Sequence, residues 1–174
     1  MPGLTVSDQA TLAPGEPGAW QTLQMMQRLA RAGSRSMTVR QLALDLTSAG
    51  WGGMRGLPQK DFTGEARRLF EFVRDRIRYV KDIDGVETLH PAEWVLQIGA
   101  GDCDDKALLL AAMLLAIGHT PRFVAVAFDP DQFSHVWVQD YLNGRWVDLE
   151  ATENLPFGEA VPLHDAVKVI TLEA

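Results

Sequence analysis

The residue best suited to covalent chemistry in this 174-residue chain is Cys103, its single cysteine. One cysteine can form neither an internal disulfide nor a cysteine zinc site, so Cys103 is either a small buried apolar residue or a reactive thiol. Cys103 follows Gly101 and Asp102 and precedes an apolar run, a pattern typical of the start of a helix. Unpaired N–H groups and the positive helix dipole there would favour both a thiolate and the oxyanion formed by its attack on a carbonyl.

Three acidic residues next to Cys103 oppose this effect. Asp102, Asp104 and Asp105 would raise the pKa of the thiol if their charges point toward it. An imidazolium partner is therefore needed, and His135, in a strand-like run, is the best candidate of the four histidines. We expect Cys103 and His135 to form an ion pair. The other three histidines are expected at the surface, beside helix or loop ends or in a polar loop: His90, His119 and His164.

The element that must position Cys103 is a helix predicted over residues 102–117. Asp102 can cap its start, Asp105 resembles the second residue of a capping box, and Gly118 suits the position after its end. The large residues of its interior leave no polar stripe for solvent: Leu108, Leu109, Leu110, Met113, Leu114 and Leu115. We therefore expect a central helix that the rest of the domain surrounds.

Strand-like segments follow this helix, at residues 122–128, 133–142, 145–152 and near 167–172. The dipeptide Asn143-Gly144 between the second and third segments predicts a tight two-residue hairpin turn. The order of the elements thus predicts an α+β domain with a helix packed on an antiparallel sheet.

The hairpin register selects the acid that would orient His135. A tight turn pairs Leu142 with Arg145, which makes Glu150 a diagonal neighbour of His135 on the same face, about 7–8 Å away. Asp148 shares that face but lies four residues along the strand from the level of His135, roughly 13 Å away. The register therefore predicts Glu150 as the acid, and Asp148 is the alternative. A one-residue bulge at the turn would move both side chains to the other face of the sheet and would defeat both assignments.

The chain divides into three segments. Residues 1–18 have few large apolar side chains and are expected to form a flexible arm. Residues 19–62 are expected to form an N-terminal helical segment that ends in a glycine-rich loop. Residues 63–174 are expected to form the catalytic core.

Apolar residues at helical spacing predict helices at 20–32 and at about 39–46, the second with Thr38 at its capping position. A third helix is predicted from residue 66 through Tyr79, and a short helix begins at Pro91.

Four runs together resemble the transglutaminase-like superfamily. Residues 101–110 (GDCDDKALLL) and 116–123 (AIGHTPRF) resemble its nucleophile motif and the end of the nucleophile helix. Residues 134–138 (SHVWV) resemble its histidine strand, and 144–152 (GRWVDLEAT) the strand that bears its acid. The resemblance covers roughly residues 65–152. The whole chain also resembles transglutaminase-like proteins carried by tailed phages and prophages.

This resemblance implies a papain-like fold and a Cys103–His135–Glu150 triad. Members hydrolyse peptide or amide bonds, or transfer the acyl group to an amine, through a thioester on the cysteine. The chain departs from the family where Asp usually precedes a Pro-Thr or Ser-Thr pair, because it has Glu150 there. Gln97 lies at the offset of an oxyanion-hole glutamine in papain-like peptidases. Trp94 and Asp102 are further candidates for binding the oxyanion or the substrate.

The distribution of charge along the chain indicates which classes of binding partner to expect. Residues 1–80 contain eleven Arg or Lys against seven Asp or Glu, whereas residues 81–174 contain five against sixteen. The acidic half that contains Cys103 disfavours a nucleic-acid partner and favours a basic peptide or protein substrate. Phosphate-binding glycine loops, HExxH helices and paired cysteines do not occur, so neither a cofactor nor a metal is expected.

The location expected from the sequence is the cytoplasm. The longest uncharged apolar stretch, residues 107–117, has eleven residues, whereas a membrane span needs about 20. Residues 1–19 lack the apolar segment of a signal peptide.

Two functions remain open. The first is a cysteine hydrolase or acyltransferase, and the second is a catalytically silent module with a structural or assembly role in a phage or a cell envelope. Retention of Cys103, His135 and a nearby carboxylate favours the first. The substrate, the choice between hydrolysis and transfer, and the oligomeric state cannot be read from the sequence.

Overall fold

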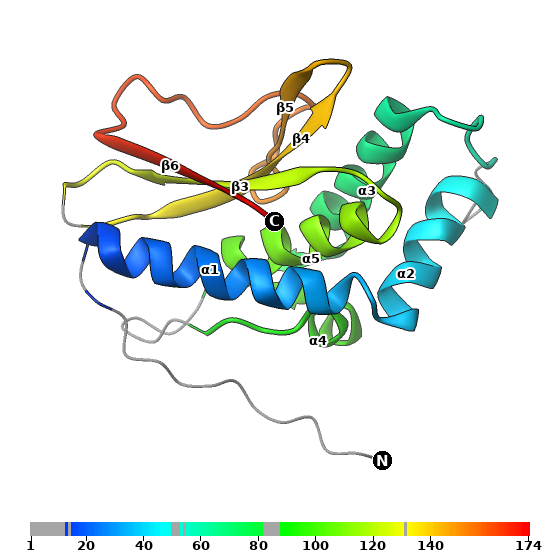
Figure 1. The fold of residues 1–174 in the computed structure, drawn as a ribbon, viewed down its shortest axis with the longest axis horizontal. Coiled ribbons are helices and arrows are strands. Elements are labelled where there is room, and N and C mark those ends of the chain that lie inside the picture. The colour runs from blue at the N-terminus through cyan, green and yellow to red at the C-terminus, as the bar shows by residue number, and fades with distance from the viewer. Residues whose placement is uncertain (1–12, 14, 50–52, 54, 82–87, 131) are drawn as a thin grey trace, which may run out of the picture.

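A computed structural model describes residues 13, 15–49, 53, 55–81, 88–130 and 132–174. Helices lie against one face of a four-stranded antiparallel sheet whose strand order is β5-β4-β3-β6 (Figure 1). The helical elements are α1 (Gly15–Gly33), α2 (Met37–Leu44), the π-helical turn η1 (Asp45–Ala49), α3 (Phe62–Arg76), α4 (Ala92–Ile98) and α5 (Cys103–Ala116). The strands are β1 (Arg78–Tyr79), β2 (Ala100–Gly101), β3 (Pro121–Ala127), β4 (His135–Leu142), β5 (Arg145–Leu149) and β6 (Lys168–Glu173). The α+β class predicted from the sequence is confirmed.

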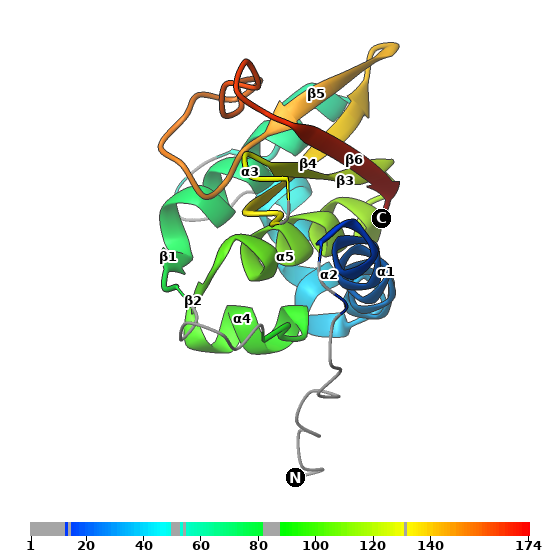
Figure 2. The same cartoon turned by 90° about the vertical axis from the view of Figure 1, so that its left-hand side faces the viewer.

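Helix α5 is the centre of the domain. Every residue from 105 to 114 is buried, and α5 packs against α1, α3 and α4 as well as against β4 (Figure 2). The side chain of Asp102 caps its start by accepting a hydrogen bond from the backbone N–H of Asp105 at 3.0 Å. Gly118 follows its end with a φ of 91°, a left-handed conformation that glycine adopts without strain. The prediction of a central, capped helix is therefore confirmed.

The β4–β5 hairpin has the predicted register. Asn143 and Gly144 both have positive φ, 51° and 83°, as a tight type I′ turn requires. The paired positions run from Leu142↔Arg145 to Val138↔Leu149. Val138 and Leu149 lie in the main hydrophobic core, so the alternate residues of the hairpin point to the opposite face of the sheet.

The N-terminal boundaries differ from those predicted. Helix α1 begins at Gly15, so the expected boundary of the flexible arm at residue 18 is too late, while residues 1–12 and 14 lie outside the described residues. Glu16 in the first turn complements the positive helix end, which supports this earlier start. Ser36, not Thr38, occupies the N-cap position of α2. None of the described helices is long and apolar enough to span a membrane.

Strands β1 and β2 form a short parallel pair that the sequence did not predict. Tyr79 pairs with Gly101, and the N–H of Val80 donates to the carbonyl of Gly101 at 3.0 Å. Helix α3 therefore ends at Arg76, not at Tyr79, because the chain becomes extended to reach β2. This pair attaches the end of α3 directly to the segment that leads into Cys103.

Candidate active site

His135 and Glu150 form the central contact of the site. His135 is the first residue of β4, and its Nε2 lies 2.6 Å from Oε2 of Glu150. Glu150 is fully buried, and its Oε1 accepts a hydrogen bond from the backbone N–H of Thr152 at 2.9 Å. The contact is the one that the hairpin register favours, although β5 ends at Leu149 and the chain turns away after it. Its role in catalysis remains a prediction.

Asp148, the alternative acid, belongs to a different network. Its Oδ1 accepts hydrogen bonds from Nε1 of Trp137 and Nε2 of Gln139, both at 2.7 Å. Asp148 and Gln139 are directly paired across the hairpin, as the register predicts. Asp148 therefore binds side chains farther along the hairpin and does not contact His135.

Cys103 is the first residue of α5 and lies against β4. Its thiol donates to Oδ1 of Asp104 at 3.5 Å, and the backbone of Val136, the residue after His135, forms a hydrogen bond with it. Burial raises the pKa of the Cys103 thiol well above its ordinary value, and the charges of Asp104 and Asp102 raise it further. The bond from Val136 opposes these effects only in part. The balance of these influences favours the protonated form of the thiol.

The ion pair expected between Cys103 and His135 is not formed. Asp104 is the hydrogen-bond partner of the thiol among the side chains that the structure describes. Glu150 engages Nε2 of His135, so Nδ1 is the ring nitrogen that this contact leaves open. The surroundings of Cys103 favour a neutral thiol over a preformed thiolate, and deprotonation of the thiol by His135 remains a prediction.

Iodoacetamide is accordingly expected to alkylate Cys103 only as the pH rises above about 8.5, the ordinary range of a thiol. Asp104→Asn removes the nearest negative charge, so alkylation at pH 7.5 should become about tenfold faster for each unit by which the thiol pKa falls. Asp165→Asn, on an exposed carboxylate of a distant loop, is the matched control. A rate that already rises below pH 8 and collapses in His135→Ala would instead demonstrate the ion pair.

The other candidate residues occupy different places around α4 and α5. Gln97 is exposed near the end of α4, and Trp94 stacks on His90 with ring centroids 3.8 Å apart. The carboxylate of Asp102 caps α5, as described above. Their roles toward an oxyanion or a substrate stay predictions. Within the described part of the chain, no group of three or more His, Cys, Asp or Glu side chains could hold a metal ion.

Two histidines that were expected at the surface have structural partners. The expectation is wrong for His119, which is buried, whereas His90 is partly exposed. The backbone N–H and Nδ1 of His90 each lie 2.9 Å from an oxygen of buried Asp105. The side chain of His119 is only 2% exposed. Its Nδ1 lies 2.5 Å from Oδ2 of Asp140, and its Nε2 lies 3.2 Å from Oε2 of Glu65. Side chains of β4 point alternately to the two faces of the sheet, so Asp140 lies on the core face with Val138. This alternation is the sequence signal that could have indicated a buried carboxylate, which needs a polar partner. His164 is exposed, as expected.

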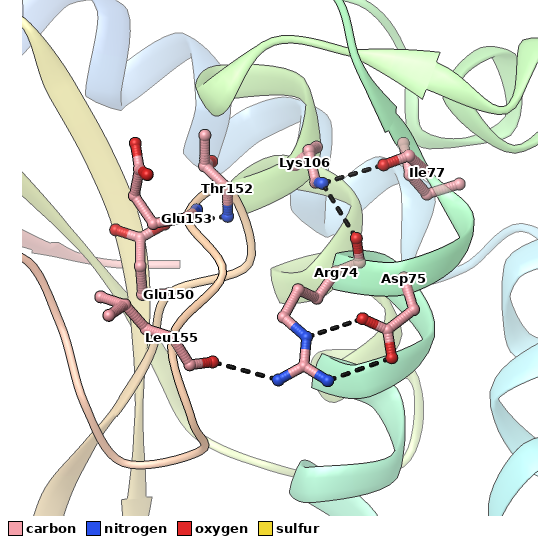
Figure 3. A network of polar contacts seen from close by, with 8 residues as sticks. All are labelled: Arg74, Asp75, Ile77, Lys106, Glu150, Thr152, Glu153 and Leu155. Carbon is pink, nitrogen blue, oxygen red and sulfur yellow. Dashed lines mark hydrogen bonds and ion pairs between the residues drawn. The ribbon is translucent and has the colours of Figure 1, made fainter.

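Lys106 is a residue of the site that the sequence did not single out. It is buried one helical turn after Cys103, and its Nζ donates to the carbonyl of Ile77 at 2.9 Å and to that of Arg74 at 3.4 Å (Figure 3). Arg74 in turn donates to the carbonyl of Leu155, in the segment that follows Glu150. The C-terminal end of α3 is therefore connected both to α5, which begins with Cys103, and to the segment that follows Glu150.

Comparison with solved structures identifies relatives in fold. A candidate cysteine protease from Cytophaga hutchinsonii matches at a TM-score of 0.50 and 18% identity, over 85% of this chain and 51% of that one. A candidate protease from Parabacteroides distasonis matches at a TM-score of 0.58 and 16% identity, over 78% of this chain and 26% of that one. A chain of the Rad4/XPC nucleotide excision repair complex matches at a TM-score of 0.54 and 11% identity, over 88% of this chain and 46% of that one.

These identities are low, so the likeness concerns the fold alone. The chain spans about half or less of the length of these proteins. A comparison with curated protein sequences finds no match. The model of the transglutaminase-like superfamily, however, matches residues 53–151, which contain Cys103, His135 and Glu150. The chain belongs to the transglutaminase-like superfamily.

Proposed function

We propose that this protein is a cysteine hydrolase or acyltransferase that acts on peptide or amide bonds through a thioester on Cys103. In the first step, Nδ1 of His135 takes the proton of the thiol while Sγ bonds to the carbonyl carbon. The imidazolium then gives this proton to the leaving amine as the carbon–nitrogen bond breaks. Water or a second amine attacks the thioester and regenerates the thiol, which yields hydrolysis or transfer.

The single observation that carries the proposal is the contact between Nε2 of His135 and the buried carboxylate of Glu150, at 2.6 Å. A carboxylate at this position orients the ring, fixes the proton on Nε2 and stabilises the imidazolium. Val136 contacts Cys103 directly, so the strand that begins with His135 reaches the nucleophile.

Stabilisation of the oxyanion is assigned to the start of α5. The first N–H groups of a helix have no partner within the helix, and they lie at its positive end. Because Cys103 is the first residue of α5, a tetrahedral carbon bonded to Sγ would form at this positive end, where the N–H of Asp105 is already bound to the carboxylate of Asp102. Trp94 and Gln97 remain further candidates for this role.

The substrate proposed is a peptide or protein, with a basic side chain near the attacked bond. Asp104 and Asp102 both act on Cys103 electrostatically, and the half of the chain that contains them has a large excess of acidic residues. Neither nucleic acid nor a cofactor enters this proposal. A cytoplasmic location and an origin in a phage or prophage remain expectations.

Labelling with a panel of acyl probes tests the proposal. We expect at least one activated acyl donor to add its acyl mass to Cys103 in the wild type, but not in Cys103→Ala. His135→Ala should slow the labelling strongly, because no other base among the described side chains contacts Glu150. Mass spectrometry of the intact protein measures the adduct directly.

The alternative function is a catalytically silent module with an assembly role in a phage or a cell envelope. The raised pKa of the thiol favours it, because a protonated thiol is a weak nucleophile. If folded protein takes up no acyl group from any probe while iodoacetamide still alkylates Cys103 at high pH, the silent module is the better account.

A further inference from the structure

The acid of the proposed triad lies on a loop and not on a strand. Strand β5 ends at Leu149, and Glu150 begins an irregular segment over residues 150–158, which we call the acid loop. Glu150 is fully buried, whereas residues 152–158 are exposed or partly exposed. A loop with few buried contacts opens more readily than the sheet from which it extends. The position of Glu150 therefore depends on the contacts that hold the acid loop.

Hydrogen bonds connect Arg74 of α3 to the carboxylate of Glu150 through the acid loop. Nη1 of Arg74 donates to the carbonyl of Leu155 at 3.0 Å (Figure 3). The N–H of Leu155 donates to the carbonyl of Glu153 at 2.8 Å. The N–H groups of Thr152 and Glu153 donate to Oε1 of Glu150, at 2.9 and 3.4 Å. This series of bonds ends at the carboxylate that contacts the histidine of the site.

The guanidinium of Arg74 is itself held in place. Its Nε and Nη2 donate to the two carboxylate oxygens of Asp75, at 2.7 and 3.1 Å. The guanidinium also lies over the ring of Phe70, 5.0 Å from its centroid. A planar guanidinium with its donors in a fixed fork can bind a carboxylate on one side and a carbonyl on the other. Arg74 is therefore a rigid connection between α3 and the acid loop.

The far end of the acid loop has its own attachments. The ring of Phe157 lies 5.9 Å from that of Phe70 and 4.3 Å from the guanidinium carbon of Arg67. The N–H of Gly158 donates to the carbonyl of Asp148 at 3.0 Å. Of these attachments, the bond from Arg74 to Leu155 is the nearest to Glu150 along the loop. Its loss would leave the loop unattached to α3 between Glu150 and Phe157.

We propose that Arg74 is a positioning residue of the triad, whose bond to Leu155 holds the acid loop on α3 and thereby keeps Glu150 at hydrogen-bond distance from His135. This inference rests on the proposed function. Arg74 acts through the position of Glu150 and not on the substrate. A displacement of a catalytic group by about 1 Å can slow a reaction by about a hundredfold, so a moderate increase in the freedom of this loop is sufficient to slow acylation.

The experiment compares two arginines of α3 that both donate to backbone carbonyls. Arg74→Met removes the donors but retains an unbranched side chain, and Arg74→Gln is a second variant with a shorter polar side chain. Arg68→Met is the matched control, because Arg68 donates to the carbonyls of Leu46 and Arg55, at 3.0 and 2.7 Å, away from the acid loop. Urea unfolding and circular dichroism establish that each variant is folded.

The first readout is hydrogen exchange of the backbone N–H groups of Thr152 and Glu153, which bind Glu150 and report the order of the loop without requiring activity. We expect exchange at least about tenfold faster in both Arg74 variants and near the wild-type rate in Arg68→Met. Wild-type exchange in a folded Arg74 variant would overturn the proposal. Equally fast exchange in Arg68→Met would also contradict it, because the effect would then follow from a general loss of stability. If Arg74→Met does not fold, Arg74→Gln decides the matter.

The second readout is the rate of acyl-probe labelling of Cys103 at neutral pH. In Arg74→Met we expect the maximal rate to fall at least about tenfold while the half-saturating probe concentration stays unchanged. In a Glu150→Gln background, Arg74→Met should cause no further loss, because the group through which it acts is absent. Losses that multiply would refute the positioning role. If no acyl probe labels the wild type, the proposed function fails, while amide exchange still tests whether Arg74 holds the acid loop.

Discussion

Replacement of Glu150 by glutamine is expected to slow the acylation of Cys103 by about a hundredfold to ten-thousandfold. The amide cannot stabilise an imidazolium at His135, and its NH₂ group can donate to Nε2, which favours the wrong tautomer. The distance of 2.6 Å between the ring and the carboxylate makes this contact the strongest constraint on the orientation of His135. The measurement is the rate of acyl-probe labelling at neutral pH.

Asp148→Asn is the matched control for Glu150→Gln, since both change one carboxylate of the same segment to its amide. Asp148 binds Trp137 and Gln139 and does not contact His135, so the rate in this variant should remain near that of the wild type. A large loss in Asp148→Asn together with a normal rate in Glu150→Gln would refute the assignment of the acid.

Replacement of His119 by alanine is expected to lower the free energy of unfolding by about 3–5 kcal/mol. The imidazole lies between Asp140, which is fully buried, and Glu65. Its removal leaves the carboxylate of Asp140 in the core without its partner, and Oδ1 of Asp140 already has no hydrogen-bond partner among the described residues. Urea unfolding measures the change. His164→Ala, on a 74% exposed ring, should change the stability little.

The same substitution should change how stability depends on pH. Burial alone would lower the pKa of His119, but the hydrogen bonds and charges of Asp140 and then Glu65 outweigh it and raise the pKa above its ordinary value of 6.5. A raised folded pKa gives stability that is fully present below the unfolded pKa and is lost as the pH rises through the folded value. The free energy of unfolding should therefore decline on the alkaline side of about 6.5.

This decline should be absent or much smaller in His119→Ala. Urea unfolding between about pH 6 and 9 compares the two proteins across the relevant range. Parallel pH dependences in the wild type and in His119→Ala would show that His119 is not the group responsible.

The sequence by itself determined the elements whose signals are local. The apolar run after Cys103 predicted a central helix, because a helix without a polar stripe can only be buried. Asn143-Gly144 predicted the hairpin turn and its register, because few residues other than these tolerate two consecutive positive φ angles. The register then distinguished Glu150 from Asp148, since strand pairing converts sequence spacing into distance.

Only the tertiary structure decided which charged groups lie next to the thiol of Cys103. The thiol of Cys103 lies against Asp104 instead of an imidazolium, and this depends on how α5 meets β4. Likewise, a histidine such as His119 or a lysine such as Lys106 resembles a surface residue in the sequence, because solvent is the default environment of a polar side chain. The partner of His119, Asp140, lies 21 positions farther along the chain, and the carbonyls that Lys106 binds, those of Ile77 and Arg74, lie 29 and 32 positions before it. Such pairs have no local signal, because their energy arises only when separate elements exclude water around both groups.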